Sequence, residues 1–297
     1  MQLLPLPCYL NGEFSDLSRA KVSVMDRGFI FGDGIYEVVP VYQGRPFRFS
    51  EHMARLERSL AEVRIPNPMD RAAWMAVVQR LIAEHARSLG QTPEQTDQLI
   101  YIQVTRGVAM RDHAMLPGLT PTVFASTNTL KPPSAEQRAK GVACVTAEDF
   151  RWQKAHIKST SLLSAVIARQ ISVDADAVET VMFRDGFLSE AAASNVWVVS
   201  QGQVLGPLKN NLVLEGIRYG LVEELCREAG IGFQLRPISR AEVLQADELM
   251  LSSATKEVLP VTLLDGQSVG QGPSRGKPGP IYEKLFALYQ RAKHREP

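Results

Sequence analysis

The stretch RWQKAHIKSTSLL, residues 151–163, joins a strand-like segment (142–147) to a helical segment (161–172), and Lys158 lies at the junction. Four apolar side chains follow the lysine at helical spacing, namely Leu162, Leu163, Val166 and Ile167. A lysine among apolar neighbours loses hydration, so its pKa falls and its amine becomes a nucleophile able to form a Schiff base. Taken alone, the stretch is more typical of a solvated surface lysine.

A second stretch, LSEAAASNVW at residues 188–197, gives the lysine more weight. There an acid, Glu190, is followed by small residues and then by a strand-like run. A lysine, an acid beyond one intervening strand and small residues that allow close approach together suit a pyridoxal phosphate site.

Bulk composition excludes several classes of protein. The chain has 297 residues, a formal net charge of +1 and no long block of like charge, so neither nucleic acid nor a membrane surface is an expected partner. No apolar run approaches the ~20 residues of a membrane span, and the proline-interrupted start predicts no signal peptide. Three widely spaced cysteines (Cys8, Cys144, Cys226) suggest neither a disulfide framework nor a metal site, which favours a reducing, cytoplasmic compartment.

The N-terminal part reads as short strands and turns. Residues 9–14 predict a hairpin with an Asn-Gly turn, and residues 22–25 predict a short strand. Residues 26–33 are glycine-rich and are interpreted as a loop that leads into a strand ending at Tyr42. The glycines are attributed to turn geometry rather than to a phosphate loop, because no helix is expected to follow.

Two helices are expected next, at residues 50–65 and 70–89. Arg55 lies beside the apolar stripe of the first helix, where a surface arginine is the ordinary interpretation. In a later loop, Arg111 and His113 are two residues apart, so in an extended chain both side chains would point the same way. They would then form a cationic clamp for a carboxylate, although an exposed polar loop fits the spacing equally well.

A linker character at residues 130–134 predicts the domain boundary. We therefore expect a small N-terminal α/β domain at residues 1–129 and a larger C-terminal α/β domain at 135–297 that carries the lysine. Ser134 is expected to cap a short helix, with Gln137 at the capping-box position. Further on, the helix after Gly216 exposes backbone N–H groups that suit an anion.

Together these stretches resemble one family, the class IV (fold type IV) pyridoxal phosphate aminotransferases, and within it the D-amino acid branch. The resemblance runs from near the N-terminus to the last helix. It is carried by DRGFIFGDGIYE (26–37), EHMARL (51–56), VTRG (104–107) and the regions of Lys158 and Glu190. It implies a two-domain α/β (α+β) fold and a cytoplasmic homodimer that needs no metal.

The resemblance also implies roles for individual residues. Lys158 would bond the cofactor and move a proton between the substrate Cα and cofactor C4′. Glu190 would keep the pyridine nitrogen protonated, which makes the ring an electron sink. Further cofactor contacts are implied for Arg55, Ser194, Ile217, Arg218 and Thr255. A trap for the substrate carboxylate is implied for Tyr36, Val38, Arg111 and His113, with the loop of the last two coming from a neighbouring subunit.

Two positions depart from the family pattern. Arg218 stands where the family commonly has threonine, so a hydroxyl contact to phosphate is replaced by a large cation that either meets the phosphate or points to solvent. The residues at 191–193 are three alanines where the D branch is often serine-rich, so Ser194 is left as the nearby hydroxyl. Neither departure affects Lys158 or Glu190.

The expected reaction is a ping-pong transfer of the amino group from a D-amino acid such as D-alanine to 2-oxoglutarate or pyruvate. Three alternatives remain at this point. A branched-chain L-amino acid aminotransferase would not need the Arg111–His113 pair. A 4-amino-4-deoxychorismate lyase-type enzyme would release pyruvate without an amino acceptor. A non-enzymatic cofactor-binding protein would not need both Lys158 and Glu190.

Overall fold

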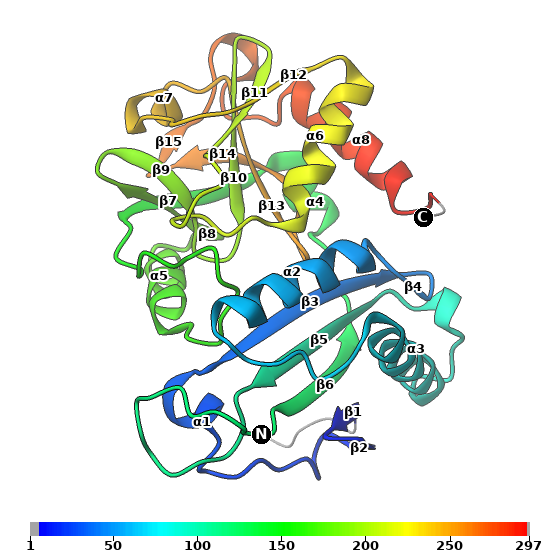
Figure 1. Cartoon of the computed structure of the whole chain (residues 1–297). Coiled ribbons are helices and arrows are strands. Elements are labelled where there is room, and N and C mark those ends of the chain that lie inside the picture. Colours follow the sequence, from blue (N-terminus) through cyan, green and yellow to red (C-terminus); the bar gives the residue numbers. More distant parts are fainter. Residues whose placement is uncertain (1–5, 296–297) are drawn as a thin grey trace. The chain divides into compact units, whose positions relative to one another are not determined.

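The computed structural model describes residues 6–295, which form two compact units (Figure 1). The first unit comprises residues 6–130 together with the short segment 157–162, and the second comprises 131–156 and 163–295. The segment that carries Lys158 therefore packs with the first unit, although it lies beyond the expected linker. Its backbone hydrogen bonds to the start of a strand of the first unit account for this placement.

The first unit is built on a six-stranded antiparallel sheet in the order β2-β1-β6-β5-β3-β4. The Asn11-Gly12 hairpin expected from the sequence is confirmed as the β1–β2 connection. The strands are β1 (Pro7–Leu10), β2 (Glu13–Asp16), β3 (Gly34–Tyr42), β4 (Arg45–Pro46), β5 (Gln98–Thr105) and β6 (Thr122–Thr129).

One face of this sheet packs against helices α2 (Phe49–Glu62) and α3 (Arg71–Ser88), while a 3-10 turn, η1 (Pro93–Gln95), precedes β5. Both helices were expected, and the apolar stripe of α2 is buried as predicted, with Met53 and Leu56 fully inaccessible. Full burial of such side chains stabilises the fold by roughly 1.5–3 kcal/mol each. Since successive strand residues face opposite sides, Tyr36 and Val38 leave β3 on the other face.

Two short-range predictions in this unit are wrong. Residues 26–33 were expected to be loop, but they contain the helix α1 (Arg27–Phe31), because the Asp26 carboxylate caps it by accepting from the Gly28 N–H at 2.8 Å. Residues 22–25 were expected to be a strand, but Ser23 folds them into a turn. Its hydroxyl accepts from the Met25 N–H, and its carbonyl accepts from the Asp26 N–H.

The second unit is built on a nine-stranded mixed sheet in the order β12-β11-β10-β13-β14-β7-β8-β9, with β15 paired to β14. Its buried face is rich in valine and leucine. The strands are β7 (Val142–Glu148), β8 (Glu179–Arg184), β9 (Phe187–Ala191), β10 (Asn195–Ser200), β11 (Gln203–Gly206), β12 (Gly232–Leu235), β13 (Glu248–Ser253), β14 (Glu257–Leu264) and β15 (Gln267–Ser268).

In the described part of the chain, five helices and a 3-10 turn complete this unit (Figure 1). The capping box predicted for Ser134 and Gln137 is confirmed. These elements are α4 (Ala135–Lys140), α5 (Leu163–Asp174), α6 (Ile217–Ala229), α7 (Arg240–Leu244), η2 (Gly272–Ser274) and α8 (Pro280–Ala292). Within residues 6–295, none of the helices combines the length and apolar character that a bilayer crossing requires.

Candidate active site

The segment 157–162 lies along the start of β3. The Tyr36 N–H donates to the Lys158 carbonyl at 3.0 Å, and the Thr160 N–H donates to the Gly34 carbonyl at 2.9 Å. Glycine is required at this contact: a Cβ on Gly34 would lie 2.9 Å from the Val104 carbonyl oxygen and 3.1 Å from the Thr160 hydroxyl. The glycines of the sequence motif thus let the lysine segment approach the sheet.

Lys158 is half-buried, and its amine nitrogen lies 4.1 Å from the centroid of the Tyr36 ring. The apolar residue just before the lysine, Ile157, is buried, but the apolar side chains that follow it are largely exposed. Leu163 and Val166 on α5 are 73% and 60% exposed, so they are directed away from the protein interior. The amine instead meets an aromatic face, whose electrons attract a cation.

Arg55 projects from α2 into a fully buried cluster of charge. Its Nε and Nη2 donate to the two carboxylate oxygens of Glu37 at 2.7 and 2.8 Å, and His52 Nδ1 lies 2.7 Å from Glu37 Oε2. Burial alone would raise the pKa of Glu37, but the charge and hydrogen bonds of Arg55, together with His52, hold it well below the usual range. Glu37 therefore stays ionised and fixes the orientation of the Arg55 guanidinium.

Arg111 and His113 both contact one aromatic ring, that of Phe31 at the end of α1. The Arg111 guanidinium carbon lies 5.5 Å from the ring centroid, and the His113 ring centroid lies 5.3 Å from it. Both residues are exposed. The structure thus gathers an arginine and a histidine side chain at one place on the surface of the first unit.

In the second unit, Glu190 lies at the end of β9 and is 5% exposed. Its carboxylate accepts hydrogen bonds from the Arg151 guanidinium, from Asn195 Nδ2 at 3.3 Å and from the Leu214 N–H at 3.3 Å. Asn195 is fixed in turn by Gly216, where a Cβ would lie 2.0 Å from the asparagine Oδ1. These contacts orient a buried acid.

The positive charge of Arg151 influences the pKa of Glu190. Burial raises the pKa of Glu190 above its usual value, and the charge and hydrogen bond of Arg151 offset part of that rise. Arg151 is held by Asp149, which accepts from its Nε at 2.9 Å and its Nη2 at 2.8 Å. Burial alone would lower the pKa of Arg151, but Asp149 and Glu190 raise it above its usual value, so the guanidinium stays charged.

The other expected cofactor contacts also lie in the second unit. The helix α6 begins at Ile217 after Gly216, which makes no side-chain cap, and a helix start of this kind suits an anion. The Arg218 side chain is 2% exposed and its Nε donates to the Tyr289 hydroxyl at 3.3 Å, so it is directed into the protein and not to solvent.

The two expected cofactor-contact hydroxyls, those of Thr255 and Ser194, also lie in the second unit. Thr255 lies in the turn between β13 and β14, with its hydroxyl 3.4 Å from that of Ser253. The Ser194 hydroxyl lies 3.3 Å from Glu179 Oε2, a buried carboxylate that also accepts from the Ala193 N–H and from Lys256 Nζ at 2.7 Å each. A buried acid, an uncapped helix start and clustered hydroxyls fit the chemistry of a pyridoxal phosphate.

Sequence reasoning missed the residues that hold the site residues in place. Asp149 and Arg151 lie two residues apart just after the end of a strand. Opposite charges this close together beside a buried strand indicate an ion pair. Glu37 also carries a signal, because it is the acid in an otherwise apolar run of β3. The role of Arg27 is harder to find from the sequence, because its hydrogen bond to the Asp112 carbonyl joins residues 85 positions apart.

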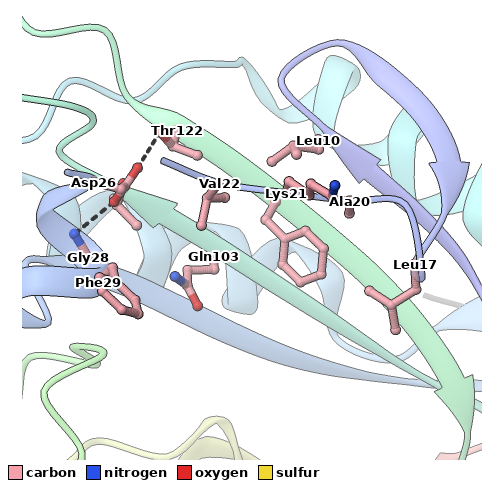
Figure 2. A pocket seen from close by; sticks show the side chains of 12 residues that line it. Leu10, Leu17, Ala20, Lys21, Val22, Asp26, Gly28, Phe29, Gln103 and Thr122 are labelled. Atoms are coloured by element: carbon pink, nitrogen blue, oxygen red, sulfur yellow. Dashed lines mark hydrogen bonds between the residues drawn. The ribbon is translucent and has the colours of Figure 1, made fainter. Parts of the chain in front are cut away.

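A cavity of about 440 Å³ lies on the face of the first sheet opposite α2 and α3 (Figure 2). Asp26 stands at its edge and accepts from the Thr122 hydroxyl at 2.6 Å as well as from Gly28 (Figure 2). The wall is mostly apolar, with Val22 and Phe29 from the segment before β3 and Phe124 from β6. Neither Lys158 nor Tyr36 belongs to this wall.

Comparisons with known proteins agree on one family. The model of the family described as amino-transferase class IV matches residues 34–264. The D-alanine aminotransferase of Bacillus licheniformis is 38% identical over 280 residues, which cover 94% of each chain. The D-alanine aminotransferase of Staphylococcus aureus (strain MSSA476) is 37% identical over 278 residues, covering 93% of this chain and 94% of the relative.

Solved structures show the same fold. The branched-chain aminotransferase of the thermophilic archaeon Thermoproteus uzoniensis with norvaline matches with a TM-score of 0.83 and 22% identity, covering 98% of this chain and 96% of that one. The branched-chain enzyme of Escherichia coli matches with a TM-score of 0.81 and 22% identity, over 97% and 94% of the two chains. At these identities the likeness concerns the fold alone.

Proposed function

Because the chain belongs to the class IV aminotransferases and is therefore a pyridoxal phosphate-dependent enzyme, we propose that it transfers the amino group of a D-amino acid of the D-alanine class to a 2-oxo acid. The observation that carries the D-amino acid assignment is the pair Arg111 and His113, whose side chains both contact the Phe31 ring. D-Alanine aminotransferases at 37–38% identity support the same substrate class.

When bound, the cofactor supplies an electron sink for the carbon that loses its proton. Lys158 would be the base and acid that moves this proton, with its amine against the face of the Tyr36 ring. Glu190, whose carboxylate accepts a hydrogen bond from Arg151, would hold a proton on the pyridine nitrogen. The substrate carboxylate would be bound by Arg111 and His113, with Tyr36 and Val38 on the open face of β3 completing its pocket.

For the cofactor phosphate, we propose the backbone N–H groups of Ile217 and Arg218 with the Thr255 hydroxyl and Arg55. The Arg218 side chain is assigned a structural part, because it is buried against Tyr289 of α8. Arg55 is assigned the phosphate because Glu37 holds its guanidinium in one orientation. Ser194 is proposed to contact the cofactor, because Glu179 holds the turn that carries it.

We further propose a homodimer. Large apolar side chains of the first unit are exposed, including Phe29 at 71% and Met110 at 81%. A second copy of the chain would remove them from water and would bring the Arg111 loop to the neighbouring site. A cytoplasmic location is also proposed, supported by three buried cysteines without disulfides.

The experiment that tests the function is the visible spectrum of the purified holoenzyme during titration with D-alanine and, separately, with L-leucine. Bleaching of the lysine-dependent band with D-alanine alone is the expected result. Bleaching with L-leucine alone would move the enzyme to branched-chain substrates and overturn the assignment of Arg111 and His113. Pyruvate release from 4-amino-4-deoxychorismate without an amino acceptor would replace the transaminase with a lyase.

Arg111→Ala is expected to raise KM for D-alanine about 10- to 150-fold, because a charge-assisted hydrogen bond to a carboxylate contributes roughly 1.5–3 kcal/mol. The cofactor dissociation constant should stay unchanged. Arg87→Ala is the matched control, since Arg87 is an exposed arginine of α3 in the same unit. Steady-state kinetics and cofactor titration give the two readouts, and unchanged kinetics of Arg111→Ala with D-alanine would contradict the trap.

A further inference from the structure

We infer that Arg27 and Phe31 of the short helix α1 are positioning residues that set the place of Arg111 and His113, and thereby the affinity of the enzyme for its substrate carboxylate. This inference rests on the function proposed above, in which these two side chains bind that carboxylate. Arg27 and Phe31 themselves do not touch substrate in this assignment.

The loop that carries Arg111 and His113 is tied down at both of its ends. At the first end, the Arg27 N–H donates to the Gly107 carbonyl at 2.9 Å, and the Ala109 N–H donates to the Met25 carbonyl at 3.3 Å. At the other end, Gly107 lies so close to Thr120 that a Cβ would stand 2.1 Å from the Thr120 carbonyl oxygen. The ends are thus fixed by backbone contacts that do not depend on the nature of the side chains between them.

The tip of the loop is held by side chains, unlike its ends, which are held by backbone contacts. Arg27 Nη1 donates to the carbonyl of Asp112, the residue between Arg111 and His113, at 2.5 Å. The Phe31 ring meets three side chains of this region: the guanidinium carbon of Arg27 lies 4.9 Å from its centroid, and Arg111 and His113 contact it as described above. One hydrogen bond therefore holds the Asp112 backbone, and one aromatic ring contacts the side chains of Arg111 and His113 on either side of it.

The helix α1 places these two groups for a local reason. Residues four apart in a helix lie on the same face, so Arg27 stands next to Phe31. Asp26 begins the helix, and Gly32 ends it in the left-handed conformation at φ 63°. The short helix is long enough for a single i, i+4 pair, and that pair is the one that meets the loop.

The Arg27 guanidinium is itself held by an anchor. Its Nε donates to Asp33 Oδ2 at 2.8 Å, and Arg106 donates to both oxygens of the same carboxylate at 2.7 and 3.0 Å. Arg27 is 3% exposed and Arg106 is 4% exposed. Asp33 therefore pairs with both buried guanidinium groups, and it keeps Arg27 directed toward the Asp112 carbonyl.

The test is the variant Arg27→Gln, which removes the donor to Asp112 and the cation beside Phe31. Folding should survive, because Asp33 keeps both hydrogen bonds from Arg106 and the Asp112 carbonyl belongs to an exposed residue. We expect KM for D-alanine to rise at least about 10-fold, while kcat changes less than about 3-fold and the cofactor dissociation constant is unchanged. Arg27→Lys should recover part of the affinity.

Two further measurements separate positioning from a general loss of structure. Hydrogen exchange of the apo protein should become faster in peptides that cover residues 110–115 but not in peptides from β5. Phe31→Leu should raise KM in the same way, because an apolar side chain remains but the aromatic face is lost. Arg71→Gln is the control, since it removes an exposed bidentate ion pair with Glu57 in the same unit.

The outcomes distinguish this inference from the proposed function. If Arg111→Ala raises KM but Arg27→Gln and Phe31→Leu leave it unchanged, the positioning inference is wrong and the trap stands. If Arg111→Ala leaves KM unchanged, the trap assignment itself is wrong. A fall of kcat in Arg27→Gln with KM unchanged would also overturn the inference, because loop placement acts on substrate binding.

Discussion

Lys158→Ala is expected to lower transamination at least about 10³-fold and to abolish the lysine-dependent visible absorption band. A positioned proton-transfer group contributes ~10²–10⁴-fold, and the same amine is also the nucleophile that bonds the cofactor. The structure gives the amine an aromatic neighbour in Tyr36 and fixes its backbone through the Tyr36 N–H. The measurements are the rate of the half-reaction with D-alanine and the spectrum of the cofactor-loaded protein.

The matched control is Lys154→Ala, because Lys154 is an exposed lysine only four residues earlier in the same stretch. Borohydride reduction of the wild-type holoenzyme followed by peptide mass mapping should place the cofactor on Lys158 and not on Lys154. A Lys158→Ala protein that keeps the band, or a label on another lysine, would show that the wrong residue was assigned.

Glu37→Gln is expected to lower the free energy of unfolding by about 3–5 kcal/mol at pH 7. Removing one partner of a buried ion pair leaves the other charge uncompensated, and that is the origin of the cost. Glu37 is 0% exposed and accepts two hydrogen bonds from Arg55, with His52 also in contact. Urea unfolding of the apo protein, followed by circular dichroism, measures the change without a contribution from the cofactor.

The pH dependence of this effect has a definite sign. The pKa of Glu37 in the folded protein is depressed below its ordinary value of 4.5, so its contribution to stability is present above pH 4.5. That contribution is lost progressively as the pH falls toward the folded-state pKa. The difference in stability between the wild type and Glu37→Gln should therefore shrink on acidification from pH 7 to pH 3.

The control for this prediction is Glu57→Gln on α2, the helix that also carries Arg55. Glu57 pairs with Arg71 at an exposed position, where such pairs contribute about 0–1 kcal/mol. If Glu57→Gln costs as much as Glu37→Gln, or if the difference at Glu37 grows as the pH falls, the buried ion pair is not the source of the stability.

Local patterns predicted much of this fold correctly. The β1–β2 hairpin, the helices α2 and α3 and the capping box at Ser134 depend on residues within one turn or one helical repeat, so the sequence contains their physical cause. The class IV family was also predicted from motifs, and it is confirmed. The wrong predictions concern short elements. The helix α1 has only five residues, so a single side-chain cap at Asp26 decided its formation against the tendency of its glycines.

The sequence by itself determined the family, the cofactor class and the amphipathic elements, because each depends on which residues are present and how they are spaced. Only the tertiary structure decided the surroundings of the key residues. Arg27 reaches the Asp112 carbonyl across 85 positions, and Asn195 meets Glu190 only because Gly216 lets the chain approach closely. A charged side chain is oriented by the partners that folding brings to it, and those partners are not encoded in its own stretch of sequence.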